Sequence, residues 1–131
     1  MSTIFSKIIN GDIPCYKVLE NNNFLAFLDI NPLVKGHVLV IPKIETDYFF
    51  DLDDDCLSEM ILFSKKVAMK IKDVFPCKKI GVSVIGLEVP HAHIHLIPIN
   101  NINDMNFSNP KLVLSNNELQ DISNIFLNHN N

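Results

Sequence analysis

Three histidines alternate with apolar residues in the stretch from His91 to Pro98, which reads HAHIHLIP. Successive side chains of a β-strand point to opposite faces of the sheet. We therefore expect His91, His93 and His95 to line one face of a strand, while the apolar residues between them pack into a core on the other. Backbone sites two residues apart are separated by roughly 6.6 Å, which suits a row of imidazoles along a phosphate-sized ligand.

Such a row is well suited to nucleophilic catalysis. A neutral imidazole nitrogen attacks phosphorus or an acyl carbon, and the adduct is labile enough for water to reopen it. The second ring nitrogen then needs a hydrogen-bond acceptor, so that the attacking nitrogen keeps its lone pair. Flanking histidines can donate to the developing charge and assist proton transfer. Because His93 is flanked on both sides, it is the predicted nucleophile.

Two other interpretations of the three histidines are open. Two imidazoles on a strand can bind one zinc ion, but the outer pair here are separated by roughly 13 Å of backbone. A metal would therefore use at most two of them and draw further ligands from elsewhere, and His37 is the other histidine on a predicted strand. Alternatively, a half-exposed strand carries histidines on its polar face with no further role. The strict register favours catalysis, and we expect no metal ion and no cofactor.

The composition indicates a soluble globular protein, and the length of 131 residues predicts a single domain spanning residues 1–131. Apolar residues make up 47% of the chain and charged residues 20%, which is ordinary for that class. The net charge is −4, and all 11 basic residues are lysines. Without arginine the chain lacks the bidentate guanidinium contact to phosphates, so we expect no nucleic-acid partner. A bound phosphate would be held mainly by imidazoles and backbone N–H groups.

The cysteine pattern and the N-terminal residues predict a cytoplasmic location. Cys15, Cys56 and Cys77 are odd in number and widely spaced, which favours reduced thiols over disulfides or a zinc site. The opening residues MSTIFSK lack the apolar core of a signal peptide. No apolar run approaches the ~20 residues that span a bilayer, so no membrane association is expected.

Hydrophobic periodicity predicts an α+β fold in which four or five strands form a sheet and the helices collect on one side. The strands are expected at residues 17–20, 24–30, 37–42, 79–85 and along the histidine stretch. Helices are expected at residues 3–9, 51–75 and after a capping box at 115–118. Residues 100–110 are expected to form a loop, and His129 a solvated tail. The predicted apolar stripe of the long helix is Leu57, Met60, Ile61, Ser64, Val67, Ala68, Ile71, Val74 and Phe75. That of the last helix is Leu119, Ile122, Ile125 and Phe126.

The segment HAHIHLI at residues 91–97 resembles the His-φ-His-φ-His-φ-φ signature of the histidine triad (HIT) family of nucleotide hydrolases and transferases. Three further segments resemble the branch called histidine triad nucleotide-binding proteins, in the same order along the chain. They are IFSKIINGDIP at residues 4–14, LAFLDINP at 25–32 and GHVLVIPK at 36–43. The resemblance covers roughly residues 4–99, and its motifs are specific.

This resemblance implies an antiparallel sheet of about five strands with a long helix and a C-terminal helix, and a homodimer. It also implies attack on the α-phosphate of a purine, AMP-like nucleotide, giving a nucleotidyl-histidine that water cleaves. By position, His93 is the nucleophile, His95 contacts the phosphate, and His91 and His37 support the imidazole network. Asp29 would accept from the ribose hydroxyls, or simply serve as a turn residue. The slot around the base would consist of Ile4, Phe5, Ile8, Phe27 and Ile30. Of these, Phe27 and Ile30 could equally be core.

The chain departs from the family pattern in the loop at residues 85–90. Typical members carry an Asn at the start of this loop and a Gln-Ser or Gln-Thr pair near its end, which hold the phosphate and the leaving group. Here those donors are absent, and Leu87 and Glu88 stand in place of the pair. An ionised Glu88 facing a phosphate would repel it. Glu88 therefore points away, or the loop reaches a different leaving group, or activity is weak. Backbone N–H groups at residues 87–89, including those of Glu88 and Val89, could still bind the nucleotide.

A zinc site found in some members is not expected here. Its cysteine pair would fall on Thr3 and Ser6, and its histidine on Glu45. The predicted function is a hydrolase that cleaves purine nucleoside phosphoramidates or related nucleotides, a nucleotide phosphoramidase. The alternatives are a dinucleoside polyphosphate hydrolase with the same chemistry, a nucleotide-binding or sensing module with weak catalysis, and a metalloprotein.

Overall fold

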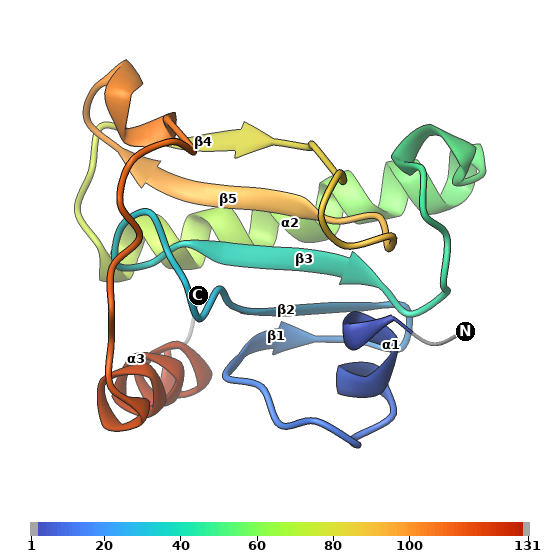
Figure 1. Cartoon of the computed structure of the whole chain (residues 1–131), viewed down its shortest axis with the longest axis horizontal. Coiled ribbons are helices and arrows are strands. Elements are labelled where there is room, and N and C mark those ends of the chain that lie inside the picture. The colour runs from blue at the N-terminus through green and yellow to red at the C-terminus, as the bar shows by residue number, and fades with distance from the viewer. Residues whose placement is uncertain (1–2, 130–131) are drawn as a thin grey trace.

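A computed structural model describes residues 3–129, which form a five-stranded antiparallel sheet with helices on both faces (Figure 1). The strand order is β1-β2-β3-β5-β4, and every neighbouring pair is antiparallel. The strands are β1 Lys17–Glu20, β2 Phe24–Leu28, β3 Val38–Pro42, β4 Lys79–Ser83 and β5 Ile94–Ile99. The predicted α+β fold with an antiparallel sheet is confirmed. The prediction that the helices collect on one side is wrong, because the first helix packs through Phe5 on the face opposite the other two.

Each of the three α-helices begins at a residue whose side chain accepts a backbone N–H of the first turn. They are α1 Ile4–Ile9, α2 Asp54–Val74 and α3 Asn116–Asn128. The caps are Thr3, Asp53 and Ser115, and Ser115 forms the predicted capping box with Glu118. The long helix begins later than predicted because Phe49–Asp51 form a separate 3-10 helix, η1, ahead of the cap. None of the helices in residues 3–129 combines the length and the apolar composition of a membrane span.

The alternation of side chains along the strands divides the core between the two faces of the sheet. Val38 and Val40 belong to a large cluster that α2 and α3 complete, whereas Leu39 and Ile41 belong to a smaller cluster with Phe5 of α1. This alternation follows from the two-residue repeat of a β-strand. In Figure 1, α2 lies behind the sheet and α1 in front of it. The site described below lies on the α1 face.

Both amphipathic helices are rotated slightly from their predicted buried stripes. In α2, Phe63 is buried and Ile61 is 52% exposed, because the Phe63 ring packs against Phe24 with centroids 5.6 Å apart. In α3, Ser123 is buried in place of Ile125, and its hydroxyl donates to the backbone carbonyl of Lys17 at 2.6 Å. The buried face of each helix is therefore set by its packing against the sheet.

Three other details differ from the sequence-based expectations. The predicted loop at 100–110 contains a 3-10 helix, η2, at Ile102–Met105. His129 is not a solvated tail residue: it caps α3, is half-buried, and its Nε2 lies 3.3 Å from Asp73. The histidine stretch is not a strand throughout, since β5 starts at Ile94 and pairing with β3 begins there.

The prediction that three histidines share one strand is therefore wrong for His91 and His93. The His91 N–H bonds to the carbonyl of Val89 and that of Ala92 to the carbonyl of Thr46, so these groups are unavailable to a sheet ladder. The apolar residues between the histidines do enter the large cluster as predicted. The irregular backbone ahead of β5 gives each histidine its own environment.

Candidate active site

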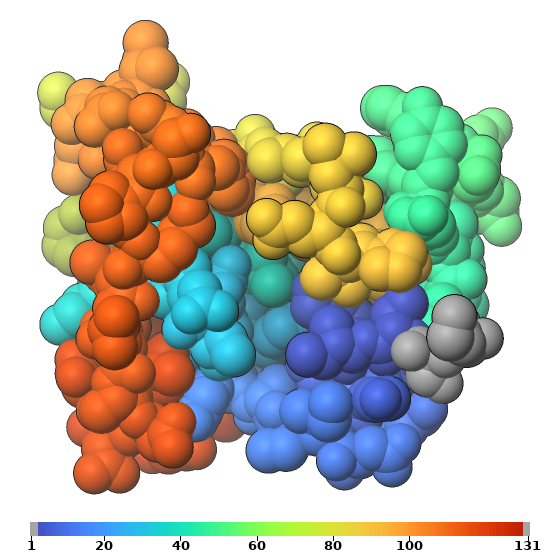
Figure 2. Space-filling view, in the orientation of Figure 1, coloured from blue at the N-terminus to red at the C-terminus, as the bar shows by residue number. Residues whose placement is uncertain are grey.

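A cavity of about 510 Å³ opens on the α1 face of the sheet. Figure 2 shows it as a hollow near the centre of the molecule, between the blue α1, the yellow loop at residues 85–89 and the orange segment that leads to α3. Eleven of the twelve predicted site residues line it, and His91 is the exception. The eleven are Ile4, Phe5, Ile8, Phe27, Asp29, Ile30, His37, Glu88, Val89, His93 and His95.

His93 is held with one ring nitrogen turned away from the cavity. Its Nδ1 lies 2.7 Å from the backbone carbonyl of His91. A carbonyl can only accept, so Nδ1 carries the proton, and the neutral ring has an unprotonated Nε2. The edge-on contact with Phe5, at a centroid distance of 5.1 Å, also restrains the ring. A histidine in this state has the lone pair that a nucleophile needs.

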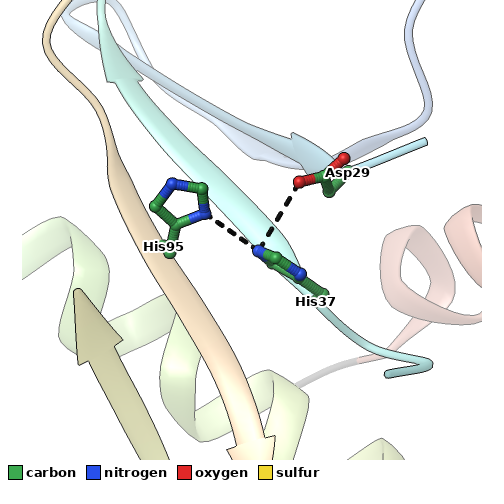
Figure 3. Close-up of side chains that lie close together, drawn as sticks. All are labelled: Asp29, His37 and His95. Atoms are coloured by element: carbon green, nitrogen blue, oxygen red, sulfur yellow. Dashed lines mark hydrogen bonds and ion pairs between the residues drawn. The ribbon is translucent and has the colours of Figure 1, made fainter. Parts of the chain in front are cut away.

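His37 and His95 form a second chain of directed hydrogen bonds, shown in Figure 3. The backbone N–H of Leu33 donates to Nδ1 of His37 at 3.0 Å, so neutral His37 carries its proton on Nε2. That Nε2 lies 2.9 Å from Nδ1 of His95 and donates to it. His95 must then carry its own proton on Nε2. His95 thus lines the cavity as a neutral hydrogen-bond donor.

Burial keeps both rings neutral. Burial, followed by repulsion from His95 once that ring is protonated and from Lys111, lowers the pKa of His37 to about 3. Burial, followed by repulsion from His93 when that ring is protonated, lowers the pKa of His95 to about 4. Both pKa values lie far below neutral pH, so the directions of the hydrogen bonds derived above hold there.

His91 lies beneath α1 and does not reach the cavity, contrary to the expected row of three imidazoles along a ligand. Its ring is fully buried, with Nε2 donating to the carbonyl of Pro42 at 2.9 Å. Its Nδ1 therefore accepts from the hydroxyl of Thr3 at 3.0 Å. Burial lowers the pKa of His91, which keeps this ring neutral too. Its contribution to the site is the backbone carbonyl that orients His93.

The residues at the positions of the family's optional zinc ligands are joined by hydrogen bonds. One carboxylate oxygen of Glu45 accepts the backbone N–H of Thr3 at 2.7 Å and the hydroxyl of Ser6 at 2.9 Å. The Thr3 hydroxyl in turn accepts the N–H of Ser6 and donates to His91. These bonds attach the start of α1 to the segment after β3 and, through His91, to the segment before β5.

Asp29 lies at the end of β2, at the edge of the cavity. One carboxylate oxygen accepts the N–H of Asn31 at 2.9 Å, and the other lies 3.6 Å from Nε2 of His37. Burial raises the pKa of this carboxyl, although the bond from Asn31 opposes the shift. A carboxylate in this position can accept hydrogen bonds from two adjacent hydroxyl groups of a ligand.

Ligand atoms of Asp29, His37 and His95 lie within 4.8 Å of one another, which raises the question of a metal ion. The hydrogen bonds argue against one. If Nε2 of His37 bound a cation, the proton would move to Nδ1, which already receives the N–H of Leu33. The N–H of Leu33 and the new N–H at Nδ1 of His37 would then face each other. These residues therefore do not fit a metal ion unless the loop that carries Leu33 rearranges.

Among the lining residues that sequence reasoning missed, Phe107 and Lys111 come from the segment before α3. The Phe107 ring packs on His95 at a centroid distance of 4.9 Å, and the N–H of Leu112 donates to the carbonyl of Pro32 at 2.8 Å. These contacts hold the segment before α3 against the cavity. Two signals could have found it: an isolated aromatic residue in an Asn-rich stretch, and the one basic residue that follows Lys79.

Comparison with known proteins places these features in a family. The HIT domain model matches residues 10–102. An uncharacterized HIT-like protein of Methanocaldococcus jannaschii is 44% identical over 99 residues, covering 72% of this chain and 77% of that protein. The adenosine 5'-monophosphoramidase of Schizosaccharomyces pombe is 40% identical over 99 residues, covering 75% and 74%.

Solved structures agree with the sequence comparisons. A HIT family protein of Bacillus subtilis superposes with a TM-score of 0.75 at 34% identity, covering 95% of this chain and 94% of that one. A Hit-like protein of Bartonella henselae gives a TM-score of 0.82 at 28% identity over the same shares of the two chains. The chain belongs to the HIT family.

Proposed function

We propose that this protein is a hydrolase that cleaves the α-phosphate linkage of purine nucleoside phosphoramidates through a nucleotidyl-histidine intermediate. The observation that carries the proposal is the 2.7 Å hydrogen bond from Nδ1 of His93 to the His91 carbonyl. It leaves an unprotonated Nε2 on a ring that lines the cavity. The name of the S. pombe relative, an adenosine 5'-monophosphoramidase, supports the choice of substrate.

In the first step, Nε2 of His93 attacks the α-phosphorus and the phosphorus–nitrogen bond of the substrate breaks. The leaving amine departs after taking a proton from solvent, and the ring becomes a cationic nucleotidyl-imidazolium. The His91 carbonyl stabilises this cation because it already accepts from Nδ1. Nε2–H of His95 donates to a phosphoryl oxygen on which charge develops. In the second step, water attacks phosphorus, the bond from phosphorus to Nε2 of His93 breaks, and the proton released by the water passes to solvent. AMP leaves and the neutral ring of His93 is restored.

The nucleoside would lie between the apolar lining of α1 and β2 and the carboxylate of Asp29. Phe5 and Phe27 are buried with their rings edge to face at 5.6 Å, whereas Ile4 and Ile30 are 50% and 59% exposed at the rim. A flat purine fits an apolar slot of this kind. Asp29 would accept from the two ribose hydroxyls and so fix the sugar.

The direct test is release of AMP from adenosine 5'-phosphoramidate by the wild type and by His93→Ala. We expect the variant to lose AMP release by at least about a thousandfold while it still binds AMP, because it lacks the nucleophile. His129→Ala, altered at the end of α3 away from the cavity, should keep wild-type turnover. Unchanged turnover by His93→Ala would refute the mechanism.

The same assay separates the proposal from its alternatives. Diadenosine polyphosphate in place of the phosphoramidate identifies a dinucleoside polyphosphate hydrolase if it turns over faster. Tight AMP binding by calorimetry with negligible turnover of either substrate identifies a nucleotide-binding module.

We further propose that the protein works in the cytoplasm, as a homodimer. Cys15, Cys56 and Cys77 are all free in the structure, and thiols of this kind are typical of a reducing compartment.

A further inference from the structure

The charges around the cavity are poorly matched to a nucleotide unless Lys111 takes part. Asp29 and Glu88 contribute two carboxylates to the lining, and the histidines His37 and His95 are neutral. Of the lining residues that the structure describes, Lys111 alone carries a permanent positive charge. A phosphate group brings further negative charge into this site, so without a cation its binding would be opposed.

The position of Lys111 is set by its own segment. Its ammonium donates to the backbone carbonyls of Phe107 and, at 3.1 Å, of Asn109. An ammonium has three N–H donors, so one remains for an oxygen of a ligand. The segment is fixed in turn through Phe107, whose ring packs on His95, and through the bond between Leu112 and Pro32.

The charge of Lys111 acts at the floor of the cavity. Its positive charge opposes protonation of His37 and favours the ionised form of Asp29, lowering the pKa of each as a lesser contribution than burial. Lys111 and His95 line the same cavity, so a phosphate bound there can meet both the ammonium and the N–H of His95. In Figure 2 the orange segment borders the hollow on the side opposite α1.

We propose that Lys111 binds the phosphate of the nucleotide, and that the segment at residues 107–111 supplies the ligand that the loop at residues 85–90 lacks. This inference rests on the proposed function, and it adds a phosphate-specificity residue to it. Lys111 lies beyond residues 10–102, the part of the chain that the HIT domain model matches. The role is thus a property of this chain's C-terminal segment.

The experiment is calorimetric binding of AMP and of adenosine to the wild type, Lys111→Met and Lys111→Arg. Loss of one partly exposed ion pair should weaken AMP binding about tenfold in Lys111→Met, which corresponds to about 1.4 kcal/mol. Adenosine lacks the phosphate, so its affinity should change less than about twofold. Lys111→Arg keeps the charge and should bind AMP within about threefold of the wild type.

Lys66→Met is the matched control, because this lysine is exposed on α2, which covers the opposite face of the sheet. It removes the same charge and should leave both affinities unchanged. Raising the salt concentration should weaken AMP binding to the wild type more than to Lys111→Met. Circular dichroism checks that the variants are folded.

Three results would overturn the inference. Wild-type AMP affinity in Lys111→Met would refute it while leaving the proposed function intact. An equal loss of AMP and adenosine would show that Lys111 only supports the wall of the cavity. Failure of the wild-type protein to bind either ligand would refute the proposed function and this inference with it, a pattern distinct from the first two.

Discussion

Three backbone groups, each with a single possible hydrogen-bonding role, set the protonation of the histidines. The carbonyl of His91 places a proton on Nδ1 of His93, and the carbonyl of Pro42 places one on Nε2 of His91. The N–H of Leu33 keeps Nδ1 of His37 unprotonated. The backbone thereby assigns one neutral tautomer to each ring, including His95, whose Nδ1 accepts from His37. In these tautomers His93 presents a nucleophilic nitrogen while His95 presents a hydrogen-bond donor.

Because these buried histidines are neutral, the free energy of unfolding should depend on pH. Folding lowers the pKa of His37 from 6.5 to about 3 and that of His95 from 6.5 to about 4. Between about pH 6.5 and 4 the unfolded chain therefore binds protons that the folded chain does not. The free energy of unfolding should fall as the pH falls, by up to about 1.4 kcal/mol per pH unit for each of the two rings. Urea titrations at several pH values measure this.

The variant His37→Asn isolates one of these contributions. Asparagine does not titrate, so the slope of unfolding free energy against pH between 6.5 and 4 should decrease by about the amount of one histidine. An identical slope in His37→Asn and the wild type would contradict the buried, neutral state derived for this ring.

At the scale of elements, the regular parts of the fold follow from the sequence and the irregular parts do not. Strand β1 has its predicted ends, and Ser115 caps α3 as predicted, since both depend on local pattern. The start of β5 does not follow from the sequence. The N–H of His91 bonds to the carbonyl of Val89, and that of Ala92 to the carbonyl of Thr46, which is far away along the chain. These hydrogen bonds keep residues 91–93 out of the sheet. The wall residue Lys111 was missed for a similar reason: its place depends on a bond between Leu112 and Pro32, which no periodicity encodes.

The turn into β3 provides a test of how tightly two elements pack. Gly36 has φ +92°, and a Cβ there would lie 2.9 Å from Cδ2 of Phe75 and 3.2 Å from Cγ of Pro98. Gly11 has a similar φ of +83°, with nothing within 4 Å of its Cβ position. Both substitutions to alanine place a side chain in left-handed backbone, at about 1–2 kcal/mol. Gly36→Ala adds a clash, so it should cost about 1–3 kcal/mol more than Gly11→Ala.

Chemical denaturation of the two glycine variants measures this difference, and Gly11→Ala is the matched control for the backbone contribution. Equal destabilisation by the two substitutions would show that the Phe75 ring moves aside freely, contrary to the packing seen here.

At the scale of the whole molecule, the sheet ends in an edge strand that bears apolar side chains. β4 is the last strand in the order, at the top of the sheet in Figure 1. Val82, Val84 and Ile85, on this strand and just after it, are 60%, 39% and 46% exposed. An apolar edge of this kind pairs readily with another strand, and a twofold symmetric pair is the commonest arrangement of identical subunits. We propose that two copies of the chain pair along β4.

Sedimentation velocity tests this pairing. The wild type should sediment at twice the mass of one chain, and Val82→Lys should shift it toward the monomer by placing a charge at the edge. Val113→Lys changes a valine that is 96% exposed on the segment before α3, and it should leave the dimer intact. A monomeric wild type, or a Val82→Lys protein as dimeric as the control, would contradict the proposed pairing.

The central claim is that Nε2 of His93 forms a bond to phosphorus, and trapping the intermediate tests it most directly. Adenosine 5'-phosphoramidate is mixed with excess enzyme and quenched in base within the first turnover, since phosphorus–nitrogen bonds of histidine are acid-labile. Peptide mapping by mass spectrometry then locates the adenylyl group. We predict that it is found on the imidazole of His93. AMP accumulating in the same samples with no adenylyl group on that ring, or with the group on another residue, would contradict the mechanism.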